Sequence, residues 1–407
     1  MVIFCKRNGL NAFQCCVDFV EIVYICVFYT TIELNANLTI IMKKIFPLLV
    51  VCLVCLISGS LVSCQEEQVL QGTPYVDAPL RAMRMEQISV AYRNIDKDVE
   101  VLVDFGDGST PVSVMGPIAA THKYEEPSSG QPDGAYHIKV TAMGQTIEKR
   151  ILVYPLRAIS ELVNEIRTPG YDKVLVMAHR ANTTNTSIPE NSIAAVEACI
   201  AAGVEFIETD THITADGHVV ICHDQTINRT TNGTGDITKM TLEQIKSYRL
   251  KDRKGVVTDM TMPTLEEFLK AARGKIYVNL DYSPRTASTA DVMSIVEKMD
   301  MMGQTLFYCN SVEKVNEVLS IDPTAQAYPW HSNYTSLPGP GYFIQCSYEP
   351  GKSTNLGAAM KAGMIPTVNF LNGGKIEDLL NTYPDVRVIQ SDISDELIPY
   401  LKGKGLR

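Results

Sequence analysis

The feature that most constrains the fold of this chain is the alternation of short apolar runs with helical segments in its second half. Eight runs have the length and apolar content of buried strands. Segments with helical spacing separate most of them, such as Ser192–Ala202, which Gly203 closes. The expected strands are Val174–Ala178, Val204–Asp210, Ile276–Asp281, Thr305–Cys309, Ala325–Tyr328, Phe343–Cys346, Ile365–Val368 and Val386–Gln390.

Strands that alternate with helices form parallel sheets, and eight such units fit a TIM (β/α)8 barrel. We therefore predict an α/β protein whose barrel covers residues 171–407, preceded by a linker at 156–170. An open doubly wound sheet is the alternative, but no glycine-rich phosphate loop follows the first strand. Smaller expected elements are a linker helix at Leu156–Ile166, a strand–turn–strand excursion around Asp216-Gly217, and helices at Ala290–Met301, Val312–Leu319 and Lys375–Tyr383.

Residues 82–155 have a different pattern, in which short runs of alternating polarity are separated by turn signals. This pattern predicts an all-β sandwich. The segments Asp104–Ser109 and Tyr136–Val140 resemble the PKD-like modules of surface proteins, although Val103 stands where those modules have a tryptophan. The resemblance implies a spacer or a partner-binding module. We expect Asp107-Gly108 to make a tight turn rather than a calcium site.

The first 64 residues contain the pattern of an export signal. Met42-Lys43-Lys44 is basic, Ile45–Ile57 is almost entirely apolar, and Leu61–Cys64 resembles the bacterial lipoprotein cleavage box. The resemblance implies a lipid on Cys64 that attaches an exported protein to a membrane, at the outer membrane, at the cell surface or facing the periplasm. The expected segments are an upstream extension of the gene model at 1–41, a signal peptide at 42–63 and a tether at 64–81.

A membrane anchor that uses Ile22–Tyr29 and Ile45–Ile57 is the alternative for this region. Each of these runs is shorter than the roughly 20 residues that a membrane-spanning helix needs. Seven of the eleven cysteines lie within the first 64 residues. The other four, which we expect to be buried free thiols, are Cys199, Cys222, Cys309 and Cys346.

The formal net charge of −10 argues against a nucleic acid as partner, because binding to a phosphate backbone requires clustered Lys and Arg. No such cluster occurs in the sequence. An acidic protein can still bind a phosphodiester if a bound metal ion supplies the local positive charge.

Polar residues follow the first two strands directly. His179 and Arg180 follow the first strand, and Glu208 and Asp210 end the second. Side chains at positions i and i+2 of a strand share one face, so the two carboxylates converge. The two acidic oxygens suit a hard divalent cation, Ca²⁺ or Mg²⁺. The histidines His179 and His223 suit an acid and a base on either side of that cation.

The same residues carry a family resemblance. The order His179-Arg180, Pro189-Glu190-Asn191, Glu208-x-Asp210 and His223-Asp224 is similar to the motif set of the glycerophosphodiester phosphodiesterase family. The likeness continues through NRTTNGTG, MTLEQIK and MPTLEEFL and covers roughly Tyr171 to the C-terminus. It implies a metal-dependent phosphodiesterase that hydrolyses small-molecule glycerophosphodiesters to glycerol 3-phosphate and an alcohol.

The resemblance also implies roles for individual residues. Glu208, Asp210 and Asp281 are expected to hold the metal, with Asp281 one methylene shorter than the glutamate of the family. His179 and His223 are expected to act as the acid/base pair. The residues expected to bind substrate or to hold its binding groups are Arg180, Glu190, Asn191, Ser283 and Arg285.

Several of these expectations contain alternatives. Glu190 is expected to hold Arg180 or a metal-bound water, and Asn191 to cap the following helix or to contact substrate. Ser283 replaces a lysine of the family, and Arg285 is a candidate to supply the missing charge. His331 is a candidate for the pocket mouth, whereas His122, His137, His212 and His218 are expected to be exposed.

Two further substitutions separate the chain from the family pattern. Ala181 stands in place of a glycine after His-Arg, and Pro366 in place of a tryptophan. Two rival functions therefore remain open. One is a phospholipase-D-like or lyase-type enzyme that acts on lysolipids or other phosphodiesters, and the other is a surface binding protein without catalysis.

Overall fold

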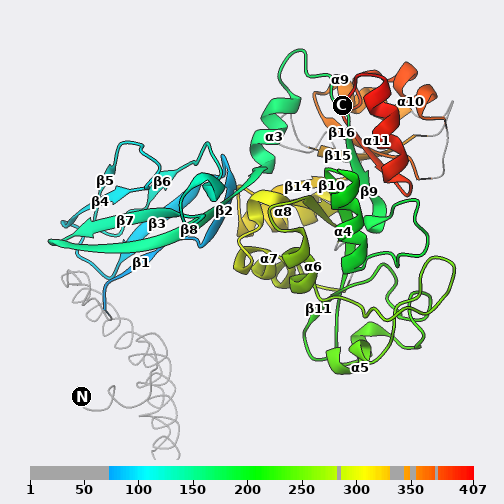
Figure 1. Cartoon of the computed structure of the whole chain (residues 1–407), viewed down its shortest axis with the longest axis horizontal. Helices are drawn as coiled ribbons and strands as arrows, with labels where there is room; N and C mark the ends of the chain where they lie inside the picture. The colour runs from blue at the N-terminus through cyan, green and yellow to red at the C-terminus, as the bar shows by residue number, and fades with distance from the viewer. Residues whose placement is uncertain (1–72, 282–285, 331–342, 349–353, 372–374) are drawn as a thin grey trace, which may run out of the picture. The chain divides into compact units, whose positions relative to one another are not determined.

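The computed structural model describes residues 73–281, 286–330, 343–348, 354–371 and 375–407. The chain divides into two compact units, Met1–Gln71 and Gly72–Arg407. The first unit lies outside the described residues, and so do the predicted signal peptide, Cys64 and the first half of the expected tether. All of the described residues lie in the second unit (Figure 1).

Eight parallel strands form a nearly closed barrel, as the sequence predicts. Their order in the sheet is β14-β13-β12-β10-β9-β17-β16-β15, and a parallel bridge between Trp330 and Gln345 joins β14 to β15. The strands are β9 (Leu175–Ala178), β10 (Phe206–Ile213), β12 (Tyr277–Asp281), β13 (Thr305–Cys309), β14 (Gln326–Pro329), β15 (Phe343–Ser347), β16 (Ile365–Asn369) and β17 (Val388–Ser391).

Helices surround the barrel and bury the outward-facing side of its strands in one large hydrophobic cluster. Polar side chains fix where several of them begin: Ser192 caps α4, and Thr264 makes a capping box at α6. The helices are α4 (Ile193–Ala202), α6 (Leu265–Ala272), α7 (Thr289–Lys298), α8 (Val312–Ile321), α9 (Thr354–Lys361), α10 (Ile376–Thr382) and α11 (Ser394–Gly403).

A second cluster fills the barrel at the end where its strands begin. Leu175, Phe206 and Tyr277, from the starts of three strands, pack with residues of helix α3 (Ile159–Ile166). Because this end is filled with apolar side chains, polar groups that point into the barrel gather at the opposite end, where the strands finish. Active sites of TIM barrels lie at that carboxyl-terminal end.

An excursion follows β10, as the Asp216-Gly217 turn predicts. The strand runs on to Ile213 and pairs in antiparallel fashion with β11 (Val219–Ile221). Residues 222–262 then form an insertion that contains the short helix α5 (Leu242–Lys246) before α6 begins (Figure 1). The insertion has a small hydrophobic core of its own, made by Val220, Cys222, Ile227, Ile237, Ile245, Leu250 and Met262.

Residues 73–157 form two β-sheets that share one hydrophobic core. The three-stranded sheet has the order β1-β3-β6, and the five-stranded sheet has the order β2-β8-β7-β4-β5. The strands are β1 (Tyr75–Asp77), β2 (Arg81–Arg84), β3 (Ile88–Arg93), β4 (Glu100–Asp104), β5 (Val112–Met115), β6 (Ala120–His122), β7 (Tyr136–Ala142) and β8 (Gln145–Arg157).

This β region begins earlier than the expected residue 82, because β1 lies within the segment expected as a tether. It ends two residues later than expected, because β8 continues past Pro155 to Arg157. A proline has no N–H to donate, and the pairing of β2 with β8 shifts register between Met83 and Arg84, opposite this point. The linker helix α3 therefore begins at Ile159 and not at Leu156.

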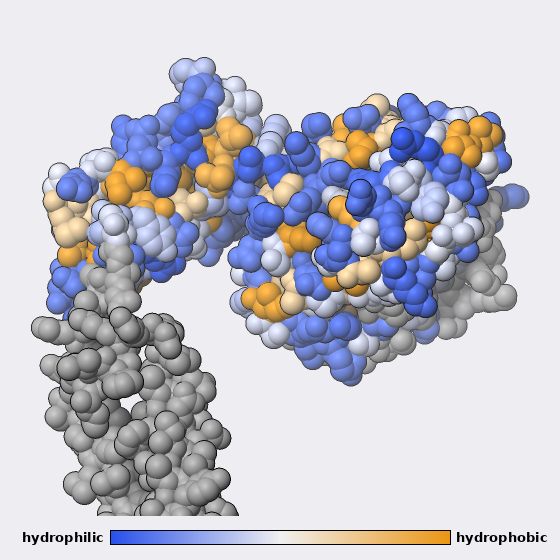
Figure 2. All heavy atoms as spheres, turned by 90° about the horizontal axis from the view of Figure 1, so that it is seen from below, coloured by the Kyte–Doolittle hydropathy of each residue, from blue (hydrophilic) through white to orange (hydrophobic). Residues whose placement is uncertain are grey.

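The described surface is mostly hydrophilic, with hydrophobic residues in small groups on the face that Figure 2 shows. Among the described residues, no helix has the length and apolar content needed to cross a membrane. Cys199, Cys222, Cys309 and Cys346 are buried free thiols, as expected.

Candidate functional site

Three carboxylates meet at the end of the barrel where the strands finish. Glu208 and Asp210 lie on β10, and Asp281 is the last residue of the neighbouring strand β12. The parallel register pairs Asp210 with Asp281 directly. One carboxylate oxygen from each of the three residues lies within 4.8 Å of the others. The structure thus brings together the three residues that the sequence predicts as metal ligands.

Burial makes this cluster costly without a cation. Glu208 is 4% exposed and Asp210 is 1% exposed. Burial, followed by the nearby charges of Asp210 and Asp281, raises the pKa of Glu208 well above its ordinary value. A divalent cation relieves this repulsion, and a site made only of oxygen ligands favours Ca²⁺ or Mg²⁺. The residues present therefore fit such an ion.

The turn after β9 supplies one hydrogen bond to this cluster. The backbone N–H of Arg180 donates to Oε2 of Glu208 at 3.0 Å. Arg180 and Ala181 have φ values of 53° and 55°, in the left-handed region that residues with a Cβ rarely adopt. The methyl group of Ala181 packs in the outer hydrophobic cluster and is buried. The replacement of the family's glycine therefore places no methyl among the residues that line the site pocket.

Each of the two predicted acid/base histidines is held by a carboxylate. Nδ1 of His179 lies 2.8 Å from Oδ1 of Asp392, and Nδ1 of His223 lies 2.7 Å from Oδ1 of Asp224. With Nδ1 engaged in this way, a proton exchanged with a bound molecule passes through Nε2. Asp392 follows β17, the last strand of the barrel, and was not among the residues picked out from the sequence.

One cavity of about 140 Å³ is lined by His179, His223 and the three carboxylates. Neutral side chains complete its wall, and these are Asn279, Tyr308, Trp330, Gln345, Asn369 and Gln390. The pocket therefore combines a candidate cation site, two imidazoles and a set of amides that can both donate and accept hydrogen bonds.

Arg180 and Glu190 form an ion pair beside this pocket, with 3.3 Å between Nη1 and Oε1. The expected contact between Glu190 and Arg180 is thus present. Arg229, from the insertion, also donates to both carboxylate oxygens of Glu190, at 2.9 Å and 2.7 Å. Its Nε donates to Asp224 at 2.8 Å. Arg229 therefore links the partner of Arg180 to the partner of His223.

The charges in this network keep its carboxylates ionised. Burial raises the pKa of Glu190, but the hydrogen bond from Arg229 and the charges of Arg180 and Arg229 bring it below its ordinary value. The hydrogen bond from Arg229 is also the main cause that holds the pKa of Asp224 well below its usual range. Arg229 lies in the NRTTNGTG motif, which carried the family likeness but no assigned role.

The expectation that Asn191 caps a helix is wrong, because Ser192 caps α4 by accepting from the backbone N–H of Ala195. The Asn191 side chain is buried. It donates to Oδ2 of Asp210 at 3.2 Å and accepts from the Thr209 hydroxyl at 2.9 Å. Asn191 orients a candidate metal ligand and is not among the residues that line the pocket.

The expectation that His212 is exposed is also wrong. This residue lies on the part of β10 that runs into the excursion and is 3% exposed. Its Nδ1 lies 3.0 Å from the Thr286 hydroxyl, and its Nε2 lies 3.2 Å from the backbone oxygen of His223. His218 is exposed, as expected.

His122 and His137, also expected at the surface, are both partly buried. His122 contacts Asp107 and stacks on Phe105, and His137 lies between Asp133 and Glu148. The candidates Ser283, Arg285 and His331 lie outside the described residues.

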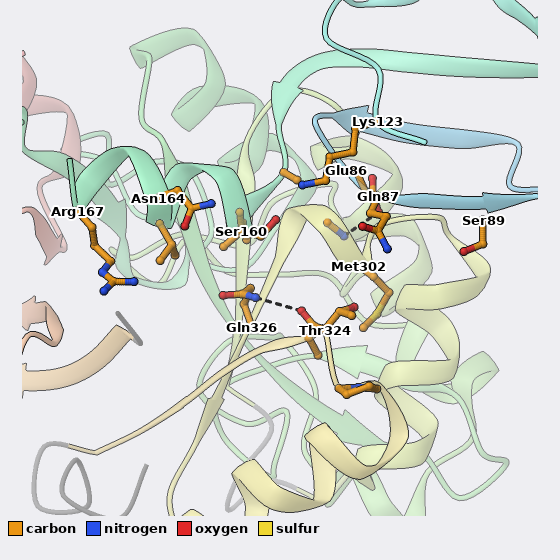
Figure 3. Close-up of a pocket in the computed structure, with 16 residues that line it drawn as sticks. Glu86, Gln87, Ser89, Lys123, Ser160, Asn164, Arg167, Met302, Thr324 and Gln326 are labelled. Atoms are coloured by element: carbon orange, nitrogen blue, oxygen red, sulfur yellow. Dashed lines mark hydrogen bonds between the residues drawn. The ribbon is translucent and has the colours of Figure 1, made fainter. Parts of the chain in front are cut away.

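A larger cavity, of about 620 Å³, lies elsewhere in the structure (Figure 3). Glu86 and Lys123 from the β region, Asn164 and Arg167 from α3, and Gln326 from β14 contribute to its lining. Neither the histidine pair nor the carboxylate cluster lines it. We therefore assign the functional site to the smaller cavity, because that is where groups capable of acid/base chemistry and cation binding meet.

Residues 179–316 match the Glycerophosphoryl diester phosphodiesterase family. This segment is a domain of that family. It contains both histidines and all three carboxylates of the pocket, whereas Asp392 lies beyond it.

Curated relatives of this domain carry similar names. The chain is 49% identical over 74 residues to "Glycerophosphodiester phosphodiesterase" of Caldanaerobacter subterraneus subsp. tengcongensis, a match that covers 18% of this chain and 30% of the relative. It is 35% identical over 102 residues to "Glycerophosphodiester phosphodiesterase 1" of Homo sapiens, covering 24% and 29% of the two chains. The chain thus spans less than a third of the length of these two relatives.

A solved structure shares the fold of the domain. The crystal structure of a glycerophosphoryl diester phosphodiesterase from Parabacteroides distasonis matches with a TM-score of 0.54 and 21% sequence identity. The match covers 61% of this chain and 92% of the other. At this identity the likeness concerns the barrel fold alone.

Proposed function

We propose that the chain is a metal-dependent phosphodiesterase that hydrolyses glycerophosphodiesters to glycerol 3-phosphate and an alcohol. The observation that carries this proposal is the meeting of two carboxylate-bound histidines and a three-carboxylate cluster in one pocket. The family match at residues 179–316 and the names of the relatives support the same reaction class.

In this proposal Glu208, Asp210 and Asp281 hold Ca²⁺ or Mg²⁺, which supplies positive charge to the non-bridging oxygens of the phosphodiester. The guanidinium of Arg180 adds positive charge at the pocket rim, where Glu190 orients it. Asn191 fixes the orientation of Asp210. The cluster thus acts as a rigid site whose ligands are oriented before a substrate binds.

His179 and His223 move the protons. One imidazole accepts the proton of the attacking hydroxyl or water, and the other donates a proton to the leaving oxygen. Asp392 and Asp224 hold Nδ1 of the two rings and stabilise the imidazolium that forms in each case. Attack by the neighbouring glycerol hydroxyl through a cyclic phosphate uses the same residues, so the pocket is compatible with both routes.

An assay with glycerophosphocholine tests this function. The expected result is release of glycerol 3-phosphate and choline with Mg²⁺ or Ca²⁺, and loss of this release in EDTA or in His179→Ala. Phosphorus NMR of the product separates hydrolysis from the lyase-type alternative, because a lyase stops at the cyclic phosphate. If the metal-loaded chain bound the diester but released nothing, the third candidate, a binding protein without catalysis, would replace the enzyme.

We further propose that residues 82–155 are a PKD-like spacer or partner-binding module, and that Cys64 carries a lipid which attaches the exported protein to a membrane. The motif Leu61–Cys64 supports the second statement. Mass spectrometry of membrane-extracted protein is expected to find an acylated N-terminal Cys64. A product that retains unmodified residues before Cys64 contradicts this assignment.

A further inference from the structure

The insertion at residues 222–262 ends in a tight turn that exposes two adjacent valines. Val256 is 60% exposed and Val257 is 48% exposed, and we call this pair the Val256–Val257 tip. An antiparallel bridge joins Lys251 to Val257, and the backbone N–H of Asp252 donates to the carbonyl of Val256 at 2.8 Å. The buried carboxylate of Asp252 accepts from the backbone N–H groups of Lys254 and Val256, at 2.9 Å and 2.8 Å.

These hydrogen bonds hold the tip in one conformation, so exposure of the two valines is built into the turn. Neither valine belongs to the small hydrophobic core of the insertion. Folding leaves these aliphatic side chains in water. Contact with an apolar partner removes them from water, which is favourable. The rigid turn lowers the entropy cost of such a contact.

The charges around the tip indicate what that apolar partner is. The insertion has seven Lys and Arg residues and five Asp and Glu residues, a net charge of +2 in a chain of net charge −10. Lys251, Arg253 and Lys254 lie in the turn itself, and the one acid among them, Asp252, is buried. Exposed aliphatic residues with basic neighbours match a lipid surface that carries negative charge, where headgroups attract the cations and acyl chains accept the valines.

The tip is fixed to the rim of the candidate site. The backbone N–H of Arg253 donates to the carbonyl of Thr186 at 3.0 Å, and its guanidinium donates to the carbonyl of Thr183. Both threonines lie in the loop that follows His179, and Asn182 of the same loop donates to Asp392. The insertion also supplies His223 and Arg229.

We propose that the Val256–Val257 tip docks the barrel on an anionic lipid surface, with the two valines in the interface between headgroups and acyl chains. The docked tip holds the mouth of the pocket beside the membrane, where diesters attached to lipids are concentrated. Docking itself is a binding equilibrium of the tip and does not rest on the proposed hydrolysis.

The experiment places a fluorescent reporter in the tip of the full chain. The sequence has a single tryptophan, Trp330, so Val257→Trp adds one emission on a known background. The matched control is Ile118→Trp, at a residue of the β region that is 60% exposed, compared with 48% for Val257. We expect phosphatidylglycerol vesicles to shift the emission of Val257→Trp to the blue, and lipids brominated along their acyl chains to quench it.

Ile118→Trp is expected to show neither effect, even if another segment of the chain attaches it to the vesicle. Lys254→Gln, made in the Val257→Trp background, is expected to need about fivefold more anionic lipid to reach half of the emission shift. The reason is that each basic residue near an anionic membrane strengthens binding by about fivefold. Val256→Asp is expected to abolish the shift, with melting temperature checked to show that the fold is retained.

Equal quenching of the reporters in Val257→Trp and Ile118→Trp would overturn the proposal. An equal shift with neutral phosphatidylcholine vesicles would overturn the role of charge and hence the assignment to an anionic surface. A shift caused by added protein and not by any vesicle would assign the tip to a protein partner instead.

Discussion

Nδ1 of His179 lies 2.8 Å from Oδ1 of Asp392, although 213 residues separate them in the sequence. The contact exists because β9 and β17 are neighbours in the barrel, so the residues after their last positions meet. Burial raises the pKa of Asp392, but the hydrogen bond and charge of His179 and the amide of Asn182 bring it below its ordinary value. Asp392 therefore remains a carboxylate at neutral pH and can fix the tautomer of His179.

His179→Ala is expected to lower kcat by about 10²- to 10⁴-fold, the usual loss for a general acid or base. Asp392→Asn keeps the size of the side chain but removes its charge, and is expected to lower kcat by about 10- to 100-fold with little change in KM. The check is steady-state kinetics with glycerophosphocholine. His218→Ala is the matched control, because this histidine is exposed and lies outside the pocket.

His212→Ala is expected to damage the protein although His212 does not line the pocket. The buried imidazole contacts the backbone oxygen of His223 and the Thr286 hydroxyl, so its removal leaves both without that partner. We expect a lower melting temperature together with reduced activity. A variant with unchanged stability and activity would mean that these contacts have no role.

Arg229→Met is expected to lower kcat by roughly 10-fold or more, because the guanidinium aligns Glu190 and Asp224 around the pocket. Metal affinity, measured by calorimetry, should stay near that of the original chain, since Arg229 touches none of the three carboxylates. Arg249→Met is a suitable control from the same insertion. A loss of metal binding in Arg229→Met would show that the network supports the cation site and not the histidines.

Metal removal is expected to lower both activity and stability. Glu208 and Asp210 are buried beside the half-buried Asp281, so their negative charges repel one another. An ion present at a hundred times its dissociation constant adds about 2.7 kcal/mol to the free energy of unfolding. EDTA should therefore lower the melting temperature by several degrees, and Ca²⁺ or Mg²⁺ should restore it. Asp281→Asn should weaken this response, whereas Asn279→Ala, whose side chain lies outside the three-carboxylate cluster, should keep it. Full activity in EDTA would contradict the metal-dependent mechanism.

Glu86 gives the protein a pH-dependent contribution to stability. Burial is the main cause that raises its pKa to about 7, and the charges of Asp300 and Asp322 act in the same direction. A carboxyl whose pKa is higher in the folded protein favours folding most at low pH, and this contribution is lost as the pH rises through 7. The free energy of unfolding should therefore fall between about pH 4.5 and 8 because of this group.

Glu86→Gln is the variant that checks this dependence, because a neutral amide imitates the protonated acid. Its stability relative to the original chain should increase as the pH rises from 5 to 8, measured by urea unfolding at several pH values. Glu86 accepts from the backbone N–H groups of Met83 and Gly303, at 2.6 Å and 3.2 Å, and an amide can accept only one of these bonds. A stability difference that is independent of pH would contradict the raised pKa.

Much of the barrel follows from the sequence, because buried parallel strands must be short and apolar. The strand Thr305–Cys309 is found with its expected bounds, and Phe343–Cys346 and Ile365–Val368 are each one residue longer. The carboxylates and histidines of the pocket also follow from the sequence, since they stand directly at strand ends or in ordered motifs.

The residues that the sequence did not single out act through contacts that depend on the folded barrel. Asp392 becomes a partner of His179 only after the last strand lies beside the first. Arg229 reaches Glu190 across 39 residues because the insertion folds back over the loop after β9. His212 follows Asp210 in a polar stretch that suggests exposure, but the antiparallel pairing with β11 buries it. An acidic residue two positions after an expected strand was the one available signal for Asp392.

The hydrogen-bonded register of β10 and β12 sets Asp210 opposite Asp281. The distance between these two acids is therefore an inter-strand spacing, which the sheet imposes and which the surrounding loops do not change. The loops at the pocket mouth and the insertion, in contrast, contribute none of the three carboxylates. A protein engineer can therefore replace the loops at the pocket mouth, or residues 222–262 except His223 and the residues that contact it. The cation site is then retained, because the barrel strands alone form it.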